Sequence, residues 1–369
     1  MIFVNPRHVR APYGVRERAA HSLAGFEAAK AEITAWPGYE PTPLVDLRGL
    51  ARALGVAAIR YKDEAGRFGL GSFKALGGAY GVLSVVRMHG RDITVTTATD
   101  GNHGRSVAWG AQMFGCRAMI YVPVQCSAPR ERAIARYGAE VVRTDVGYDD
   151  TVRRCAADAA QHHRFIVSDT SWPGYEDVPR TVTHGYAVMV DEALSQTDAL
   201  PTHVFVQGGV GALAAAVAGH LWERLGPDRP RVIVVEPETA ACLMASAKAG
   251  HAAAIAGDAL SVMAGLACGQ ASPLAWDVLE RGAFAFMTVA DDVTAPCMRL
   301  LANAPHGDPA IIAGESAIAG LAGLMAAVRS AETRAVLGLD ANSRVLLIGS
   351  EGATDPDIYA AIVGTLPTR

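Results

Sequence analysis

The sequence predicts a doubly wound α/β fold built on parallel sheets, because strand-like and helix-like runs alternate along most of the chain. The strand-like runs are apolar or β-branched throughout and are bounded by Gly, Pro or Asp: Ile93–Thr97, Ala118–Pro123, Glu140–Thr144, Phe165–Asp169, His203–Gln207, Val232–Glu236 and Arg344–Gly349. Runs with the apolar spacing of helices lie between them: Phe73–Met88, Arg105–Phe114, Pro129–Tyr137, Asp149–His162, Gly211–Leu225 and Glu315–Ser330. Continuous apolar strands indicate sheets that helices cover on both faces.

The length of 369 residues predicts about two domains, and the composition excludes several classes of protein. Hydrophobic residues make up 50% of the chain and charged residues 19%, which excludes disorder because so apolar a chain collapses. The net charge of -4 provides no basic field, so we expect no nucleic-acid partner. The longest apolar stretches, 212–218 and 317–328, are too short or too interrupted by glycine to cross a bilayer, so we expect no membrane partner.

The N-terminal residues and the cysteines favour the cytoplasm. The arginines of residues 1–20 have no apolar run behind them, unlike those of a secretory signal. The 6 cysteines are too few to staple a chain of this length, and none lies in a CxxC pair or at zinc-finger spacing from a histidine. We therefore expect a cytoplasmic protein without a structural metal.

Lys74 is the first candidate catalytic residue, and its loop is one of four that follow a strand, where ligands bind in such sheets. It lies at the start of an apolar helix, where the helix dipole disfavours a cation. We expect a lowered pKa there, which suits an amine that forms a Schiff base. A lone lysine is more often a surface residue, but Phe68, Phe73 and the glycines before Lys74 favour burial.

The second loop, Thr99–Gly104, follows the strand Ile93–Thr97. Its glycines allow backbone N–H groups to converge on an anion, while Asn102 faces a ring substituent. An ordinary polar cap of the next helix is an equally good interpretation, since Asp and Asn favour such positions.

The third and fourth loops carry glycines at the ends of two further strands. Gln207–Ala212 matches a phosphate cradle at a helix N-terminus. Gly209-x-Gly211-x-x-Ala214 also fits the dinucleotide fingerprint, with Glu236 ending the next strand, and the glycines alone do not separate the two. Ser350, in the fourth loop, offers a hydroxyl to a neutral pyridine nitrogen, although by itself this loop is an ordinary turn.

Taken together, the lysine, the Gly-Asn-His loop, the Gly-Gly-Val-Gly loop and the C-terminal serine resemble the fold-type II pyridoxal-phosphate enzymes, the tryptophan synthase β and threonine dehydratase group. Within that group the chain resembles the diaminopropionate ammonia-lyases in five segments: 67–74, 98–105, 169–175, 263–269 and 351–356. It departs from that pattern at Gly71-Ser72, at Ala212-Leu213 and at Ser350. The resemblance implies the tryptophan synthase β-like fold, with two doubly wound parallel-sheet domains.

The resemblance also implies roles for individual residues. Lys74 would hold pyridoxal 5'-phosphate as a Schiff base and, once released, act on the Cα proton of the substrate. Asn102 would bind the ring hydroxyl and Ser350 the ring nitrogen. The phosphate would be bound by the backbone of Gly208, Gly209, Val210, Gly211 and Ala212. The substrate carboxylate would be held by the loop that contains Thr99, Asp100, Gly101 and His103.

Two carboxylates complete the expected catalytic set. Asp100 would act as a second base or protonate the departing amine, because a side chain four residues ahead of a helix that begins near Gly104 is a poor cap. Asp169 would lie near the distal ammonium of the substrate, and an N-cap for the segment after Trp172 is an equally good interpretation. His103 would orient the substrate or be a satisfied helix-start histidine.

We therefore expect a homodimeric enzyme that eliminates ammonia from 2,3-diaminopropionate and yields pyruvate. A large domain would contain residues 1–83 and 183–369, and a small inserted α/β domain residues 84–182. One alternative is a related eliminase that acts on 3-hydroxyaspartate, a β-thio-substituted alanine, threonine or serine. Another is an NAD-dependent oxidoreductase, which would use 209–214 but would have no use for Lys74.

Two further groups receive an interpretation. Arg130, Arg132 and Arg136 lie on an expected helix and read as a solvated face. Cys242 and Cys268 lie in loops that the resemblance brings together, so a redox-sensitive pair is an alternative, but two free thiols are favoured in a reducing compartment.

Overall fold

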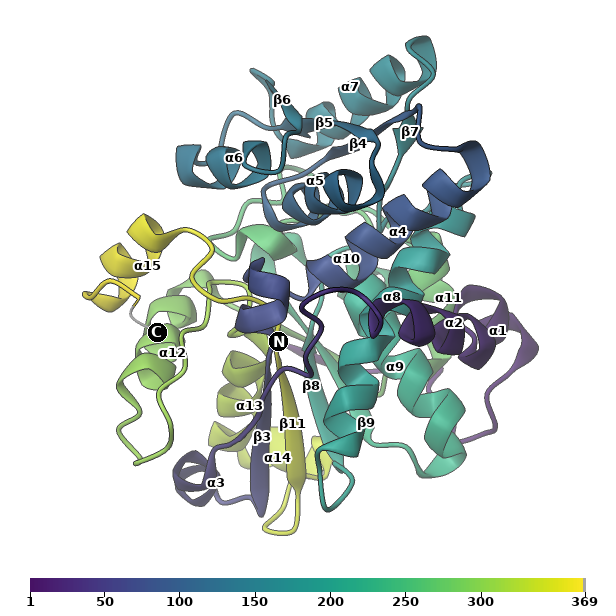
Figure 1. The fold of residues 1–369 in the computed structure, drawn as a ribbon. Helices are drawn as coiled ribbons and strands as arrows, with labels where there is room; N and C mark the ends of the chain where they lie inside the picture. The colour runs from purple at the N-terminus through teal and green to yellow at the C-terminus, as the bar shows by residue number, and fades with distance from the viewer. Residues whose placement is uncertain (368–369) are drawn as a thin grey trace.

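The computed structural model describes residues 1–367, apart from the side chain of residue 149, and contains two sheets (Figure 1). The strands are β1 (Ile2–Val4), β2 (Leu44–Asp46), β3 (Ala58–Asp63), β4 (Thr94–Ala98), β5 (Arg117–Val122), β6 (Glu140–Arg143), β7 (Phe165–Ile166), β8 (His203–Gln207), β9 (Arg231–Pro237), β10 (Ala285–Val289) and β11 (Arg344–Gly349). The larger sheet has the order β1-β10-β9-β8-β11-β3-β2, and the smaller has the order β6-β5-β4-β7. All neighbours are parallel except the edge strands β1 and β2, which pair antiparallel.

Helices cover these sheets, and short 3-10 turns join some of the elements. The helices are α1 (Val15–Ala20), α2 (Leu23–Ile33), α3 (Arg48–Leu54), α4 (Lys74–His89), α5 (Asn102–Phe114), α6 (Ala128–Ala135), α7 (Tyr148–Gln161), α8 (Asp177–Ser195), α9 (Ala212–Leu225), α10 (Cys242–Ala249), α11 (Pro273–Gly282), α12 (Thr294–Asn303), α13 (Ala319–Arg329), α14 (Ala331–Leu337) and α15 (Pro356–Val363). The 3-10 turns are η1 (Glu64–Gly69), η2 (Gly226–Asp228), η3 (Glu238–Ala240), η4 (Ala264–Leu266) and η5 (Asp291–Val293).

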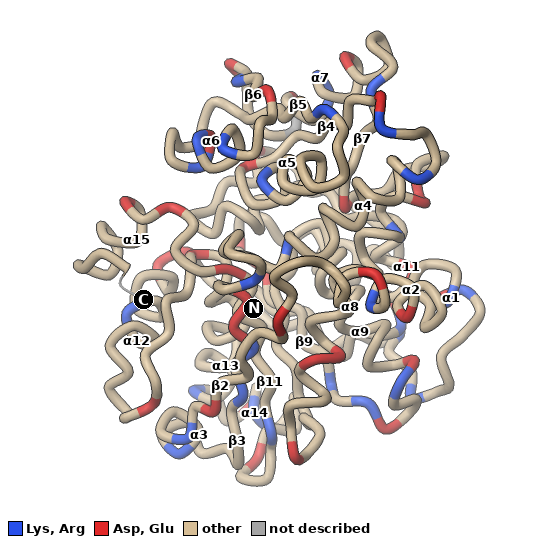
Figure 2. Tube along the Cα trace, viewed as in Figure 1, with Lys and Arg blue, Asp and Glu red and all other residues tan. Residues whose placement is uncertain are grey.

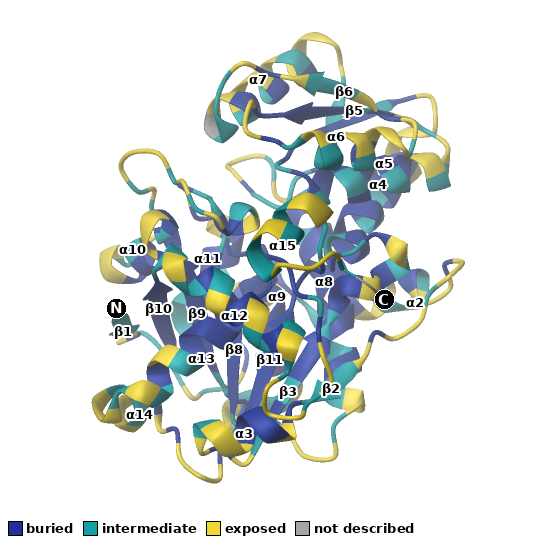
Figure 3. Cartoon of the chain, turned by 90° about the vertical axis from the view of Figure 1, so that its left-hand side faces the viewer, coloured by how far each residue is buried: buried dark blue, intermediate teal, exposed yellow. Residues whose placement is uncertain are grey.

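The central strands of the larger sheet are buried on both faces, as their continuous apolar sequences predict. In β8, Val204 and Val206 belong to one hydrophobic core and Phe205 to the other. The first core contains parts of α4, α5, α8 and α9 and continues into the smaller sheet, whereas the second contains parts of α3, α12 and α13. Figure 3 shows the buried strands inside a largely exposed outer layer of helix surfaces.

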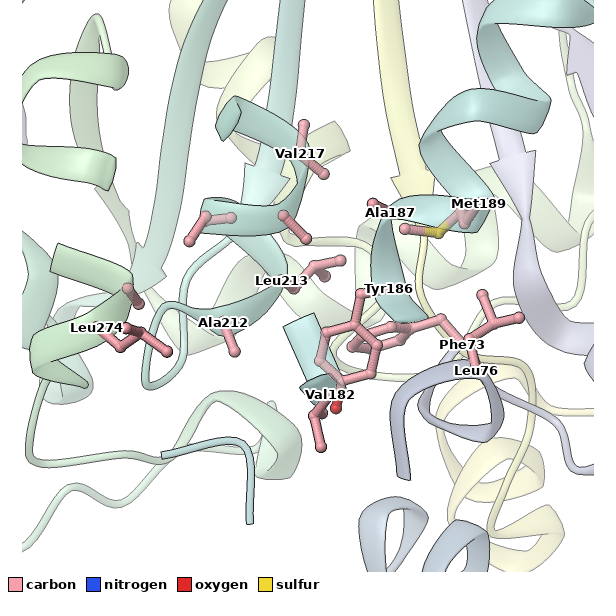
Figure 4. Close-up of a cluster of buried hydrophobic side chains, with 14 of the residues drawn as sticks. Phe73, Leu76, Val182, Tyr186, Ala187, Met189, Ala212, Leu213, Val217 and Leu274 are labelled. Atoms are coloured by element: carbon pink, nitrogen blue, oxygen red, sulfur yellow. The ribbon is translucent and has the colours of Figure 1, made fainter. Parts of the chain in front are cut away.

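Helices α4 and α8 pack where the two sheets approach each other, and this packing fixes the start of α4. The rings of Phe73, directly before α4, and Tyr186, on α8, meet edge to face with centroids 4.6 Å apart (Figure 4). No Cβ fits at Gly77 of α4, because it would lie 2.4 Å from Cε1 of Tyr186. The close approach therefore holds the first turn of α4 against α8.

The α/β class with parallel sheets is confirmed, but several elements differ from the expectation. Strands β1, β2, β3 and β10 were not expected; β1 and β2 have three residues each, which is too short for a periodic signal. The run at 165–169 forms a strand over only its first two residues. The expected domain limits at 83/84 and 182/183 fall inside α4 and α8, so that division stays a prediction. Within residues 1–367, no helix is long and apolar enough to cross a membrane.

Candidate active site

A cavity of about 470 Å³ lies beyond the carboxyl ends of β4, β8 and β11, which is where ligands bind in parallel sheets. Eleven of the residues singled out from the sequence line it: Lys74, Thr99, Asp100, Asn102, His103, Asp169, Gly209, Val210, Gly211, Ala212 and Ser350. The four loops expected from the sequence therefore meet in one place.

Gly101 and Gly208 do not line this cavity. A Cβ at Gly101 would point toward the side chain of Arg130, 3.1 Å from its Cδ. The Gly208 N–H donates to the Val235 carbonyl at 2.8 Å, so the strand pairing already uses it. The expectation that Gly208 donates to a phosphate is corrected, and the cradle begins at Gly209.

Lys74 is the first residue of α4, and its amine faces Asp169 in a close ion pair. Burial lowers the pKa of Lys74, but the negative charge of Asp169 outweighs burial, so the pKa is raised. The lowered pKa expected from the helix dipole is therefore wrong for the free amine, because a carboxylate in contact is a stronger influence than the dipole.

Asp169 lies in the loop after β7 and also accepts a hydrogen bond of 3.2 Å from the Tyr186 hydroxyl. Burial acts to raise its pKa, but Lys74 and His103 hold the pKa well below the usual range of a carboxyl. The helix that follows, α8, begins at Asp177 with Glu176 as its N-cap residue. Asp169 is therefore no helix cap. The interpretation that it pairs with the distal ammonium of the substrate stays a prediction.

Asp100 lines the same cavity, but its pKa is shifted in the opposite direction from that of Asp169. Burial raises its pKa, with a further rise from Glu351, while the Arg130 guanidinium opposes both. Helix α5 begins at Asn102 with Gly101 as its N-cap residue, so Asp100 precedes the helix by two residues and not by four. It is still no cap, because the N-cap position belongs to Gly101.

The rest of the Thr99–Gly104 loop is held by short-range hydrogen bonds. The Thr99 hydroxyl accepts from the N–H groups of Gly101 and Gly104 at 2.9 and 3.1 Å. Asn102 donates to Glu351 and accepts from Arg105 at 2.9 Å. The loop therefore presents Asn102 in one orientation.

His103 is buried next to this loop, and burial lowers its pKa. Its Nε2 lies 2.8 Å from the Val167 carbonyl, and its Nδ1 has no partner within residues 1–367. A neutral imidazole that donates from Nε2 to Val167 leaves Nδ1 free as an acceptor.

The Gly209–Ala212 segment joins β8 to α9, and Gly211 is the N-cap residue with φ +103°, a conformation that favours glycine. The first N–H groups of α9 have no acceptor inside the helix and lie where an anion binds. The dinucleotide interpretation fails at Glu236, whose buried carboxylate accepts from the N–H groups of Leu243 and Met244 at 2.7 and 2.8 Å. It caps α10 and is not free to bind a ribose.

Ser350 directly follows β11 and is buried, and its hydroxyl accepts from Gln207 Nε2 at 3.2 Å. Gln207 also donates to two backbone carbonyls, while its Oε1 has no partner among the described residues. Gln207 orients the Ser350 side chain, and its place directly before the Gly-Gly sequence was the signal available for it.

Arg130, Tyr186 and Glu351 belong to the site but were not recognised from the sequence. Arg130 was expected on a solvated face, yet its side chain is only 12% exposed, lines the cavity and donates to Glu315 at 3.3 Å. It differs from the exposed Arg132 and Arg136 because it lies in the first turn of α6, whose N-cap residue Ser127 donates to Asp355 near the C-terminus of the chain. Tyr186 sits in the middle of a helix, where no sequence signal distinguishes it from a core residue.

Cys242 and Cys268 are free thiols next to the phosphate-cradle segment, Gly209–Ala212, and Cys268 also lines the cavity. The Cys242 thiol donates to the Gly209 carbonyl at 3.4 Å, and a Cβ at Gly209 would lie 3.5 Å from Cys268 Sγ. Burial raises the pKa of Cys268 to about 12, so the thiol form predominates. The described residues contain no group of three or more His, Cys, Asp or Glu that could hold a metal.

Residues 35–348 match the family model described as pyridoxal-phosphate dependent enzyme. The chain belongs to this family and has its fold-type II architecture. It is 42% identical over 350 residues to diaminopropionate ammonia-lyase of Escherichia coli (strain K12), with 88% of each chain covered.

Solved structures extend this similarity to the whole fold. The crystal structure of holo diaminopropionate ammonia lyase from Escherichia coli matches with a TM-score of 0.91 and 38% identity, covering 98% of this chain and 96% of that one. The crystal structure of the Escherichia coli enzyme in complex with D-serine matches with a TM-score of 0.89, 38% identity and the same coverage. The resemblance and the cofactor expected from the sequence are confirmed.

Proposed function

We propose that the protein eliminates ammonia from 2,3-diaminopropionate, taking up one water and releasing pyruvate and two ammonia molecules per turnover. One observation carries the proposal: a lysine amine shares a cavity with two carboxylates, Asp100 and Asp169, whose pKa values are shifted in opposite directions. Opposite shifts in one site separate a proton-holding group from a charged one. The similarity to the Escherichia coli diaminopropionate ammonia-lyase supports the same reaction.

The residues present fit pyridoxal phosphate. Lys74 supplies the amine, the backbone from Gly209 to Ala212 supplies N–H groups, and Ser350 supplies a hydroxyl, all on the wall of one cavity. In this proposal Lys74 forms the covalent link, the backbone holds the phosphate, Asn102 holds the ring hydroxyl and Ser350 the ring nitrogen. When bound, the cofactor supplies an electron sink for the pair left on Cα after a proton is removed.

Asp169 recognises the distal amine of the substrate in this proposal. It is already placed to accept from an ammonium, because its present partner is the Lys74 amine. Once the Lys74 nitrogen is engaged in the covalent link, Asp169 is a partly buried carboxylate that lines the cavity without that cation. A substrate with a second ammonium restores the pair, whereas serine does not.

Lys74 and Asp100 divide the two configurations of the substrate between them. Lys74 removes the Cα proton that points to its own face, and Asp100 removes the proton of the opposite configuration. A carboxyl with a raised pKa is a better base than an ordinary one near neutral pH. After the proton has left Cα, the same residue returns a proton to the departing amine.

The proposal extends to the setting of the enzyme. We propose a cytoplasmic location, which the free state of all six cysteines supports. We propose a homodimer on the strength of the family, and sedimentation velocity of the purified protein tests it directly.

A screen of β-substituted alanines tests the reaction. The purified protein should be yellow, should lose that absorbance on borohydride treatment, and should release a 2-oxo acid from 2,3-diaminopropionate faster than from serine, threonine, 3-hydroxyaspartate or β-thio-substituted alanines. Both configurations of each compound are assayed. A higher kcat/KM for one of the other compounds would replace the proposed substrate, and a colourless protein would remove the cofactor assignment.

A further inference from the structure

A second cavity, of about 630 Å³, lies outside the active site, between helices that pack on the smaller sheet and the C-terminal segment of the chain. Its wall includes residues of α5 and α6 on one side and residues of the 352–356 segment on the other. Figures 1 and 3 both show α15, which follows that segment, below α6. No residue that lines this cavity belongs to the active-site wall.

Three arginines line the second cavity: Arg105 from α5, and Arg132 and Arg136 from α6 and its C-terminal end. Figure 2 shows Lys and Arg positions gathered on α6. Arg132 and Arg136 are exposed, and neither side chain has a hydrogen-bond or ion-pair partner within residues 1–367. Arg105 is mostly buried, and its Nε has no partner among the same residues. Three guanidinium groups therefore line one cavity, and none of them has an ion-pair partner within residues 1–367.

The carboxylates near this cavity are engaged elsewhere. Glu351 accepts from Asn102 and from the Ser316 N–H. Asp355 accepts from Ser127 and from the first N–H groups of α15. Glu131, on α6, pairs with Arg143. None of these acids forms an ion pair with the three arginines. Burial lowers the pKa of Arg105, and the charge of Glu351 only partly opposes this effect.

A further polar group is left open, and the remaining wall is apolar. The Thr354 hydroxyl is buried and has no partner in the described part of the chain. Apolar side chains make up much of the rest of the lining: Ala65, Pro129, Ala133, Ile312, Ala353, Pro356 and Pro367. Charge is thus gathered at the arginines, while the organic part of a ligand would contact prolines and alanines.

We propose that this cavity binds a phosphomonoester, with the phosphate held by Arg105, Arg132 and Arg136 and the organic part on the apolar wall. Guanidinium groups bind phosphate oxygens through paired N–H donors. One arginine is enough for a carboxylate, whereas the double negative charge of a phosphomonoester calls for at least two, and this cavity offers three. A cavity of this volume lies within the usual range for small-molecule sites, about 300–1,000 Å³.

The site has a defined connection to the active site. Arg105 donates to Asn102 with one nitrogen, and Asn102 lines the active-site cavity. Arg105 lies on α5, which packs on the smaller sheet, and Thr354 lies in the C-terminal segment. A ligand that contacts both residues would therefore join the two sides of the cavity. The proposed site is independent of the reaction proposed above, since binding is measured without turnover.

The test is calorimetric titration of the holoenzyme, in which the cofactor phosphate already occupies the cradle at Gly209–Ala212. Phenyl phosphate is expected to bind with one site per chain, more tightly than inorganic phosphate and at least about tenfold more tightly than benzoate. The double variant Arg132→Ala/Arg136→Ala should weaken phenyl phosphate binding at least about tenfold. Arg52→Ala removes an exposed arginine from α3 and is the matched control, with unchanged binding expected.

Cofactor absorbance and far-ultraviolet circular dichroism of each variant establish that it folds, since Arg132 and Arg136 are exposed and contact no cofactor-binding residue. Absence of phenyl phosphate binding, equal binding by the double variant, or benzoate binding as tightly would overturn the proposal. A change in sedimentation of the double variant, with no phosphate binding by the wild type, would assign the arginines to a contact between copies of the chain and would also overturn it.

Discussion

The loops that carry Asp100 and Asp169 follow strands of the same small sheet and open into the same cavity, yet they impose opposite behaviour on their carboxyl groups. Asp169 contacts the Lys74 amine and the Tyr186 hydroxyl, and its pKa is held low. Burial raises the pKa of Asp100; the charge of Arg130 opposes this rise, while the charge of Glu351 adds to it. The comparison teaches that contact with a cation, and not burial alone, decides which carboxylate stays charged.

Lys74→Ala has the largest expected effect, because it removes the amine whose charge makes the pKa of Asp169 differ from that of Asp100. The variant should lose the yellow absorbance and reduce kcat/KM by roughly 10⁴-fold or more, since both the covalent link and a base are lost. The pKa of Asp169 should rise toward that of Asp100. Turnover is followed as 2-oxo acid release from both isomers, and near-normal turnover would show that the lysine is structural.

Asp100→Asn should act on one configuration only. It keeps the shape and hydrogen bonding of the side chain but removes its basicity, so elimination from D-2,3-diaminopropionate should fall by about 10²–10⁴-fold. The reaction of the L-isomer should survive at a reduced rate. Parallel loss with both isomers would indicate protonation of the leaving group instead, and unchanged turnover of the D-isomer would exclude a second base.

Asp169→Asn should affect recognition more than rate. The variant loses the negative charge that would pair with the distal ammonium, so KM for the diamine should rise about tenfold. KM for β-chloroalanine, which lacks that ammonium, serves as the control and should change less. Equal changes in both KM values would show that Asp169 only positions Lys74.

The pH dependence of kcat/KM for the D-isomer tests whether Arg130 controls the pKa of Asp100. Asp100 must be ionised to act as a base, so kcat/KM should fall as the pH drops through its raised pKa. Arg130→Met removes the cation that opposes this rise and should move the acid limb upward by roughly one pH unit. Arg130→Lys should restore the limb, and the profile of the L-isomer should stay in place. A limb that does not move would separate Arg130 from Asp100.

Much of the fold and most of the candidate wall could be predicted from the sequence because they depend on local patterns. Continuous apolar runs gave the central strands, and the polar or glycine-rich loops at their ends converge because parallel strands end at one edge. The short edge strands β1 and β2 have no such pattern. Strand β1 is fixed by pairing with β10, which lies far from it in the sequence. Strand β2 is fixed by pairing with β3, in which polar and apolar residues alternate.

The electrostatic behaviour of the site could not be predicted in the same way. The helix position of Lys74 indicated a lowered pKa, but the residue that reverses it, Asp169, lies 95 positions away. Arg130 looked like its neighbours Arg132 and Arg136, and only the packing of α6 distinguishes them. A sequence shows which groups carry charge, whereas the sign of a pKa shift depends on contacts between distant segments.

The order of strands in the two sheets has a consequence for how the enzyme is made. The smaller sheet uses residues 94–166 only, so all of its strands are available early in synthesis. In the larger sheet, β3 lies between β2 and β11, and the register joins residues 58–63 to 344–349. The segment that leads from β3 to Lys74 gains its final neighbour only when the ribosome has nearly finished the chain. A nascent polypeptide cut short before β11 would therefore hold a paired small sheet but no completed site.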